Sequence, residues 1–165
     1  MAKKARPPIN EPPENAPQLF AIAKSDLSVA RQGKRSDDTL YETLCTLCQQ
    51  SIEKSFKALM IHRKIPYPPK HSIKILIDEM EKQQIILPDE IRISAVASVR
   101  IEGGLSFPMK FPMTFGNAVS LSEYAGNRRY SLPKKPLTEQ DYQNVLARAE
   151  KIVAWVEQQI IEPAG

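Results

Sequence analysis

The stretch Leu40–Lys64, LYETLCTLCQQSIEKSFKALMIHRK, contains neither glycine nor proline. Its apolar residues recur at steps of three and four, which predicts a helix of about six or seven turns with one apolar side. Segment 36–38 (Ser-Asp-Asp) should cap this helix and place negative charge at its start. Glu53 stands four residues before Lys57, the favourable order for an ion pair on a helix surface. Shorter segments should pack on the apolar side, which comprises Leu40, Leu44, Leu47, Cys48, Ile52, Phe56, Leu59 and Met60.

Four segments of the chain resemble one protein family. Cys48–Met60, CQQSIEKSFKALM, resembles the central helix of HEPN domains, where a Gln-Gln pair, a Glu-Lys pair and a Lys-Ala-Leu run follow in this order. Ala23–Ala30 is similar to the A-x-x-D-L-x-x-A of a first HEPN helix, and segment 71–76 to the start of a third helix. Segment 121–133 resembles the stretch in which many HEPN domains end a helix with Tyr and continue to Arg-Tyr-Pro. Together these segments make the chain similar to a HEPN domain over roughly residues 19–160.

Composition indicates one globular domain with a tail. The chain has 165 residues, of which 42% are hydrophobic and 25% charged, enough to bury a core. Residues 1–17 hold five prolines and almost no large apolar residue, so we expect a flexible tail, with residues 18–162 forming the HEPN-like helical domain. The basic N-terminus leads into prolines and acids, unlike a secretory signal, and no apolar run is long enough to span a bilayer. A cytoplasmic protein without membrane contact is expected.

The predicted fold is all-α: an antiparallel bundle of four to five helices joined by short connections. A first helix should run from Gln18 to near Gly33, and a third should restart at 71–73 after the prolines of 66–69. Segment 89–99 fits a short helix capped by Asp89, although its residues also alternate like those of a strand.

The last helix has the clearest start. Thr138 and Asp141 match a capping box, and Leu137 with Tyr142 matches a hydrophobic staple. Trp155 lies off the apolar side of this helix and indicates either a second contact surface or a side chain half-covered by the tail.

An extended or β-hairpin insert is expected around residues 99–117. Its apolar and other residues alternate strictly from position 105, so one face is apolar. Gly103-Gly104 would turn a hairpin that joins 99–102 to 105–107. The apolar face either contacts a partner, which would make the chain a homodimer, or covers the chain's own core. Its central residues are Phe107, Met109, Phe111, Met113 and Phe115.

The two cysteines, Cys45 and Cys48, are spaced for redox or metal chemistry. However, no second pair completes a zinc site, and both positions lie inside the predicted helix. We favour two small, buried, reduced residues. No metal site and no cofactor are expected.

Catalysis is not expected from the histidines. Ribonucleases of the HEPN family are recognised by R-x(4–6)-H, in which Arg stabilises phosphate charge and His transfers a proton. Arg128 and Arg129 stand where that arginine would fall, but no histidine follows them. His62 and His71 are the chain's histidines, and the plainer interpretation of His71 is a helix-start residue that bonds the backbone.

Two basic clusters point to phosphate. Segment 54–77 carries six lysines and arginines without an acidic residue, and residues 128–135 carry four. The net charge of +4 is too small to imply nucleic-acid binding by itself, and solvated helix faces are the plainer interpretation of each lysine. Tyr130 is either a stacking surface for a base or a core residue. The predicted phosphate or nucleotide site comprises Lys54, Lys57, Arg63, Lys70, His71, Arg128, Arg129 and Tyr130.

The family resemblance implies a function. HEPN domains of this non-ribonuclease kind work beside a minimal nucleotidyltransferase in two-component, toxin–antitoxin-like systems, pair as homodimers and bind nucleotides or RNA. We therefore expect a nucleotide- or RNA-phosphate-binding module without catalysis and with a nucleotidyltransferase partner. Two alternatives stay open: a degenerate HEPN ribonuclease, and a purely structural dimerisation module.

Overall fold

The computed structural model describes residues 15–67, 71–102 and 136–161, with the backbone alone for 98–102. This part of the chain is all-α, as predicted, and an isolated bridge between Ser36 and Thr39 is its one β-type pairing. None of its helices is both long and apolar enough to cross a membrane. The helices are α1 (Ala16–Gln32), α2 (Tyr41–His62), α3 (Ile73–Lys82), α4 (Asp89–Glu102) and α6 (Glu139–Ile161).

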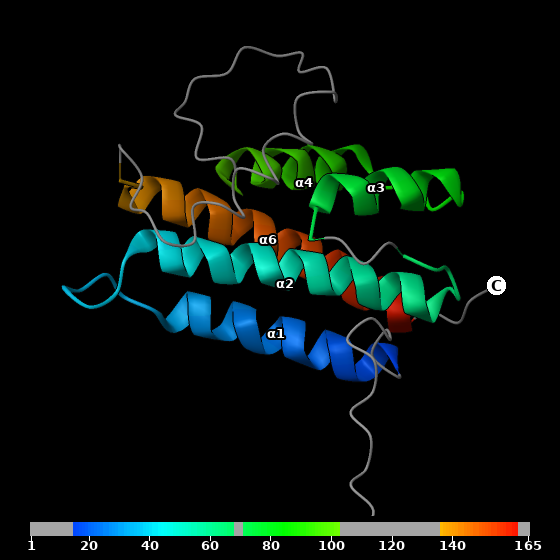
Figure 1. The fold of residues 1–165 in the computed structure, drawn as a ribbon, viewed down its shortest axis with the longest axis horizontal. Helices are drawn as coiled ribbons and strands as arrows, with labels where there is room; N and C mark the ends of the chain where they lie inside the picture. The colour runs from blue at the N-terminus through cyan, green and yellow to red at the C-terminus, as the bar shows by residue number, and fades with distance from the viewer. Residues whose placement is uncertain (1–14, 68–70, 103–135, 162–165) are drawn as a thin grey trace, which may run out of the picture.

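The helices pack around α2. α1 and α6 lie alongside it, and α3 and α4 cover the side away from α1 (Figure 1). α1 is antiparallel to α2, as their short connection predicts. α6 runs in the same direction as α2: the Leu137 amide donates to Glu42 at one end (2.7 Å), and Arg63 donates to Gln159 at the other (3.5 Å). Short connections predict antiparallel neighbours, but residues 103–138 separate α6 from α4. The direction of α6 is therefore not set by a short connection.

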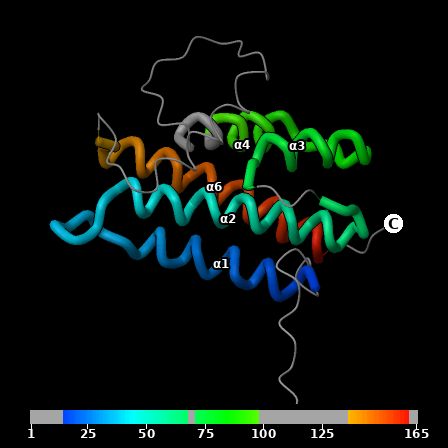
Figure 2. Tube along the Cα trace, in the orientation of Figure 1, coloured from blue at the N-terminus to red at the C-terminus, as the bar shows by residue number. Residues whose placement is uncertain are grey.

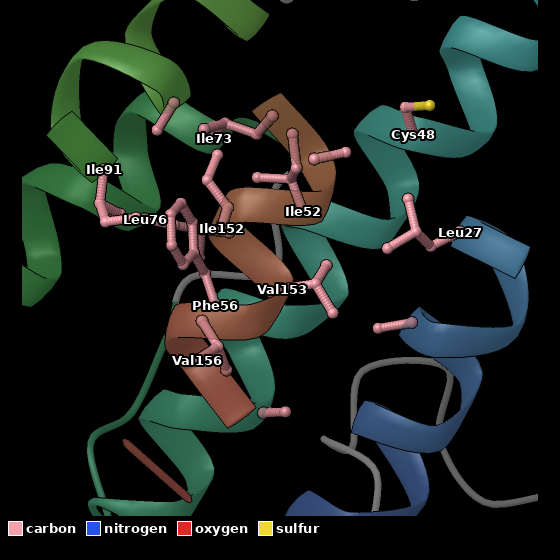
Figure 3. Close-up of a cluster of buried hydrophobic side chains, with 14 of the residues drawn as sticks. Leu27, Cys48, Ile52, Phe56, Ile73, Leu76, Ile91, Ile152, Val153 and Val156 are labelled. Carbon is pink, nitrogen blue, oxygen red and sulfur yellow. The ribbon is translucent and has the colours of Figure 1, made fainter. Parts of the chain in front are cut away.

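Side chains from all five described helices form one core. Ile52 and Phe56 of α2 are fully buried, and Figure 3 shows them with Ile152 of α6 and Leu76 of α3. The apolar spacing of Leu40–Lys64 thus predicted both the helix and its buried side.

Local capping determines where α1 begins. The helix starts at Ala16, two residues before the expected start, so the predicted tail 1–17 loses its last two residues to it. Asn15 supplies the reason, because its side chain accepts a hydrogen bond from the Gln18 amide (2.8 Å). Pro17 fits in the first turn, where an amide hydrogen has no partner inside the helix.

α2 starts without the predicted side-chain cap. Its N-cap residue is Leu40, which makes no capping bond, so the prediction of a cap from segment 36–38 is wrong. The backbones of Ser36 and Thr39 bond each other instead (3.0 and 3.3 Å), which closes a tight turn before the helix.

The later helices correct one prediction and confirm another. α4 continues to Glu102, so residues 99–102 are helical rather than the first strand of a hairpin. Ile91 and Ala95, four residues apart, are both buried, which shows that the helical period prevailed. Residues 103–117 lie outside the described part of the chain. Before α6, Thr138 and Asp141 form the predicted capping box, with bonds of 2.8 and 3.2 Å to each other's amides.

Gly33 allows the α1–α2 turn to approach α2 closely. A Cβ atom at this position would lie 2.2 Å from Leu44 Cδ2, and Leu44 is buried. The φ of Gly33 is −63°, which suits any residue, so only the close approach disfavours a side chain here.

We therefore expect Gly33→Ala to destabilise the fold by about 1–3 kcal/mol, because the added methyl overpacks the site. Urea denaturation measures this free energy. Leu44→Ala removes the clashing atoms, so Gly33→Ala should cost less in that background. An equal cost in both backgrounds would contradict the close packing.

Candidate functional site

The first predicted phosphate ligands, on α2, are bound to acidic residues of the same chain. Lys54 forms an ion pair with Asp26 of α1. Lys57 donates to Glu53 Oε1 at 2.5 Å, the helix-surface pair that the sequence predicted. The Lys57 and Glu53 side chains are only 11% and 14% exposed, so this pair is largely closed to an incoming ligand.

Glu53 also connects α2 to the start of α3. His71 Nδ1 lies 2.9 Å from Glu53 Oε1, and the His71 side chain is 77% exposed. The Lys57 ammonium lies 5.4 Å from the centre of the Tyr67 ring, on the other side of the same junction. Lys57 and His71 therefore share the carboxylate of Glu53, whereas Lys54 is paired with Asp26 of α1. The charges of both lysines are balanced by these acidic residues.

The other predicted ligands are at the far end of α2 or outside the described residues. Arg63 directly follows α2 and donates to Gln159 of α6. The role of Arg63, and of the other predicted ligands, in phosphate binding stays a prediction. Lys70, Arg128, Arg129 and Tyr130 lie outside the described part of the chain, as do Phe107, Met109, Phe111, Met113 and Phe115.

The cysteine pair is buried, as predicted. Cys45 and Cys48 are free thiols with at most 2% exposure. Burial raises the pKa of each thiol to about 12, so both remain protonated and unreactive at neutral pH. Among the residues that the structure describes, no group of three or more potential ligands is arranged to hold a metal ion.

A pocket of about 580 Å³ lies at the opposite end of α2 from Arg63. The α1–α2 turn and the first residues of α6 lie at this same end of the molecule (Figure 2). The volume is within the range of small-molecule sites. Its lining is about equally polar and apolar and includes cations, tyrosines, amides and one acid: Arg31, Gln32, Gly33, Lys34, Arg35, Tyr41, Glu139, Tyr142, Gln143 and Leu146.

Three cations, Arg31, Lys34 and Arg35, line this pocket. Lys34 and Arg35 are exposed and form no ion pair with any described residue. Arg31 donates its Nε to Glu150 of α6 at 2.7 Å. That bond orients the guanidinium and leaves its two terminal amino groups without a partner among the described residues. A planar, oriented guanidinium is suited to bind a phosphate group.

Two tyrosines form the inner wall. The rings of Tyr41 and Tyr142 stack with their centres 5.6 Å apart and their planes 22° apart. Tyr142 is buried, and its hydroxyl donates to the Ala30 carbonyl (2.5 Å), which anchors α6 to α1. Burial also raises the pKa of Tyr142, so the hydroxyl stays protonated for this bond. Tyr41 is partly buried and lines the pocket.

Sequence reasoning did not identify this pocket. The signal was present, since Arg31, Lys34 and Arg35 place three cations within five residues. It was missed because the turn was interpreted only through the cap expected from segment 36–38, and because Tyr142 was interpreted only as the staple partner of Leu137. Neither aspartate of segment 36–38 lines the pocket.

The comparisons with known proteins agree on one family. The HEPN domain model matches residues 16–159. The crystal structure of an archaeal HEPN homologue is similar, with a TM-score of 0.60 and 24% sequence identity, over 90% of this chain and 99% of that chain. At this identity the likeness shows the fold. Among curated proteins, none matches this chain significantly.

The burial of the Glu53–Lys57 pair leads to a stability prediction. Glu53→Gln leaves the largely buried Lys57 ammonium without an anionic partner, so we expect a loss of roughly 3 kcal/mol in the free energy of unfolding. Glu157→Gln is the matched control, because it breaks the exposed Lys24–Glu157 pair and should cost less than about 1 kcal/mol. Chemical denaturation compares the two variants, and equal losses would disprove the special role of Glu53.

Proposed function

Since this chain belongs to the HEPN domain family, we propose that it is a nucleotide- or RNA-phosphate-binding module without catalysis of its own. The observation that carries the proposal is the pocket at the α1–α2 turn, where Lys34 and Arg35 lie beside the oriented guanidinium of Arg31 and form no ion pair with a described acidic residue. Cations in this state attract and bind phosphate groups.

The charge balance favours this pocket over the cluster on α2. A phosphate at Lys54 and Lys57 would have to displace Asp26 and Glu53, which already neutralise these lysines. Breaking a largely buried pair costs several kcal/mol. A phosphate at Lys34 and Arg35 displaces no acidic side chain of the described residues, so more of its interaction energy remains for binding.

The family resemblance extends the proposal to partners. HEPN domains of the non-ribonuclease kind serve as one half of two-component, toxin–antitoxin-like systems beside a minimal nucleotidyltransferase. We propose the same arrangement here: a cytoplasmic homodimer with a nucleotidyltransferase partner. Light scattering of the purified chain measures the oligomer, and co-purification with the candidate partner measures the complex.

Binding of ATP and of a short single-stranded RNA, each titrated at two salt concentrations, tests phosphate recognition. We expect affinity to fall as salt rises. Lys34→Ala/Arg35→Ala should weaken binding at least about tenfold, because it removes two charge-assisted contacts, and should lower the slope of log K against log salt by about 1 to 2.

The matched control for this titration is Lys82→Ala/Lys151→Ala. It removes the same charge from exposed positions on α3 and α6. Equal weakening by both double variants would show that net charge, and not the pocket, attracts the ligand. Absence of binding to both ligands at low salt would refute the proposed function.

A degenerate ribonuclease is the second candidate, and one observation favours it. Glu53 orients the imidazole of His71, which is otherwise exposed, and a carboxylate-oriented histidine is a common proton-transfer arrangement. Against it, Lys57 shares the same carboxylate, and neither Lys54 nor Lys57 is left free to stabilise a phosphate transition state.

We therefore expect no cleavage when the protein is incubated with mixed single-stranded RNA. Gel electrophoresis of the RNA measures the outcome. Cleavage by the wild-type chain that is lost in both His71→Ala and Glu53→Gln, but kept in Glu157→Gln, would reverse the assignment and place His71 in an active site.

A further inference from the structure

The pocket at the α1–α2 turn is lined by different chemistry from the turn and from α6. Lys34 and Arg35 come from the turn, whereas Glu139 and Gln143 come from the first turns of α6. Glu139 and Gln143 are four residues apart, so they lie on the same face of that helix. A ligand that fills the pocket therefore meets cations from the turn and a carboxylate with an amide from α6.

The carboxylate of Glu139 disfavours ligands that carry more than one phosphate group. Glu139 would repel a second phosphate group placed across the pocket from the first. It would instead accept hydrogen bonds from hydroxyl groups, as carboxylates do from the ribose hydroxyls of bound nucleotides. The amide of Gln143 both donates and accepts. One anionic group together with a polyol fits this arrangement better than a polyphosphate does.

The aromatic wall supplies the third contact. Tyr142 covers one face of the Tyr41 ring, and Tyr41, which is only partly buried, lines the pocket. The stack and the Tyr142 hydroxyl bond to the Ala30 carbonyl hold this surface in place. A planar base can stack on such a surface, whatever its sequence identity.

We propose that this pocket binds a single ribonucleotide monophosphate unit, with its phosphate at Lys34 and Arg35, its ribose hydroxyls at Glu139 and its base on Tyr41. The unit is either a free nucleoside monophosphate or the phosphorylated end of a single-stranded RNA. A volume of about 580 Å³ accommodates one such unit, and a duplex cannot present its paired bases to it. This inference rests on the proposed phosphate-binding function and specifies its ligand.

Calorimetric titration of the full chain tests the inference with five probes: AMP, dAMP, inorganic phosphate, a 5′-phosphorylated single-stranded RNA and a blunt RNA duplex. We expect AMP to bind more tightly than dAMP, phosphate or duplex. Tyr41→Leu should weaken AMP binding about 5- to 150-fold, the range of one base–aromatic stack, and should leave phosphate binding unchanged. Tyr41→Phe keeps the ring and should retain AMP affinity. Glu139→Gln should remove the preference for AMP over dAMP.

The outcomes separate this inference from the proposed function. AMP binding that depends on Lys34 and Arg35, but not on Tyr41 or Glu139, overturns the ligand assignment and leaves the phosphate site standing. Equal affinity for AMP and inorganic phosphate also overturns the ligand assignment and leaves the phosphate site standing. Failure of every probe to bind overturns both the ligand assignment and the proposed function.

Tighter binding of AMP than of the phosphorylated RNA identifies the free nucleotide as the ligand, and tighter binding of the RNA identifies its phosphorylated end. Thermal melting confirms that each variant is folded, and the exposed Glu139 provides a test that does not disturb the tyrosine stack.

Discussion

The burial of α2 is the constraint on which the rest of the structure depends. Its side chains are covered by α1, α6, α3 and α4, and Ile52, Phe56 and Leu59 have no exposed surface. A helix that is apolar over so much of its circumference is stable only when other helices surround it. The shorter helices α3 and α4, which would be marginal alone in water, obtain their stability from this contact.

The same burial determines the state of the polar residues of α2. Ser51 is fully buried and donates to the Ala23 carbonyl at 2.7 Å, while Lys54 and Lys57 are held by Asp26 and Glu53. A buried polar or charged group costs several kcal/mol unless it has a partner. The packing that places α2 at the centre of the fold is therefore accompanied by ion pairs that neutralise Lys54 and Lys57. Lys34 and Arg35, by contrast, lie in the turn between α1 and α2 and form no ion pair with any described residue.

The pocket follows from the direction of α6. Because α6 runs parallel to α2, its first residues meet the α1–α2 turn, and Tyr142 stacks on Tyr41 there. Gly33 brings the turn close enough to α2 to place Lys34 and Arg35 beside the tyrosines. The core and the candidate site thus adjoin at one end of the bundle: the bond from Tyr142 to the Ala30 carbonyl belongs to the core, and Tyr41 lines the pocket.

The sequence by itself determined the helices, the buried side of α2, the Glu53–Lys57 pair and the capping box of α6, because all of these depend on residues within about four positions of one another. It also indicated the family, through short motifs of the same kind. Only the tertiary structure decided that α6 lies parallel to α2 and that Asp26 forms an ion pair with Lys54. It also decided which residues line the pocket with Tyr41 and Tyr142, namely the cations Arg31, Lys34 and Arg35. The bonds that fix this arrangement join distant residues: Lys54 and Asp26 are 28 positions apart, Leu137 and Glu42 are 95 apart, and Tyr142 and Ala30 are 112 apart. Local periodicity carries no information on which distant side chains meet, because that choice is made when the apolar faces of the helices pack together.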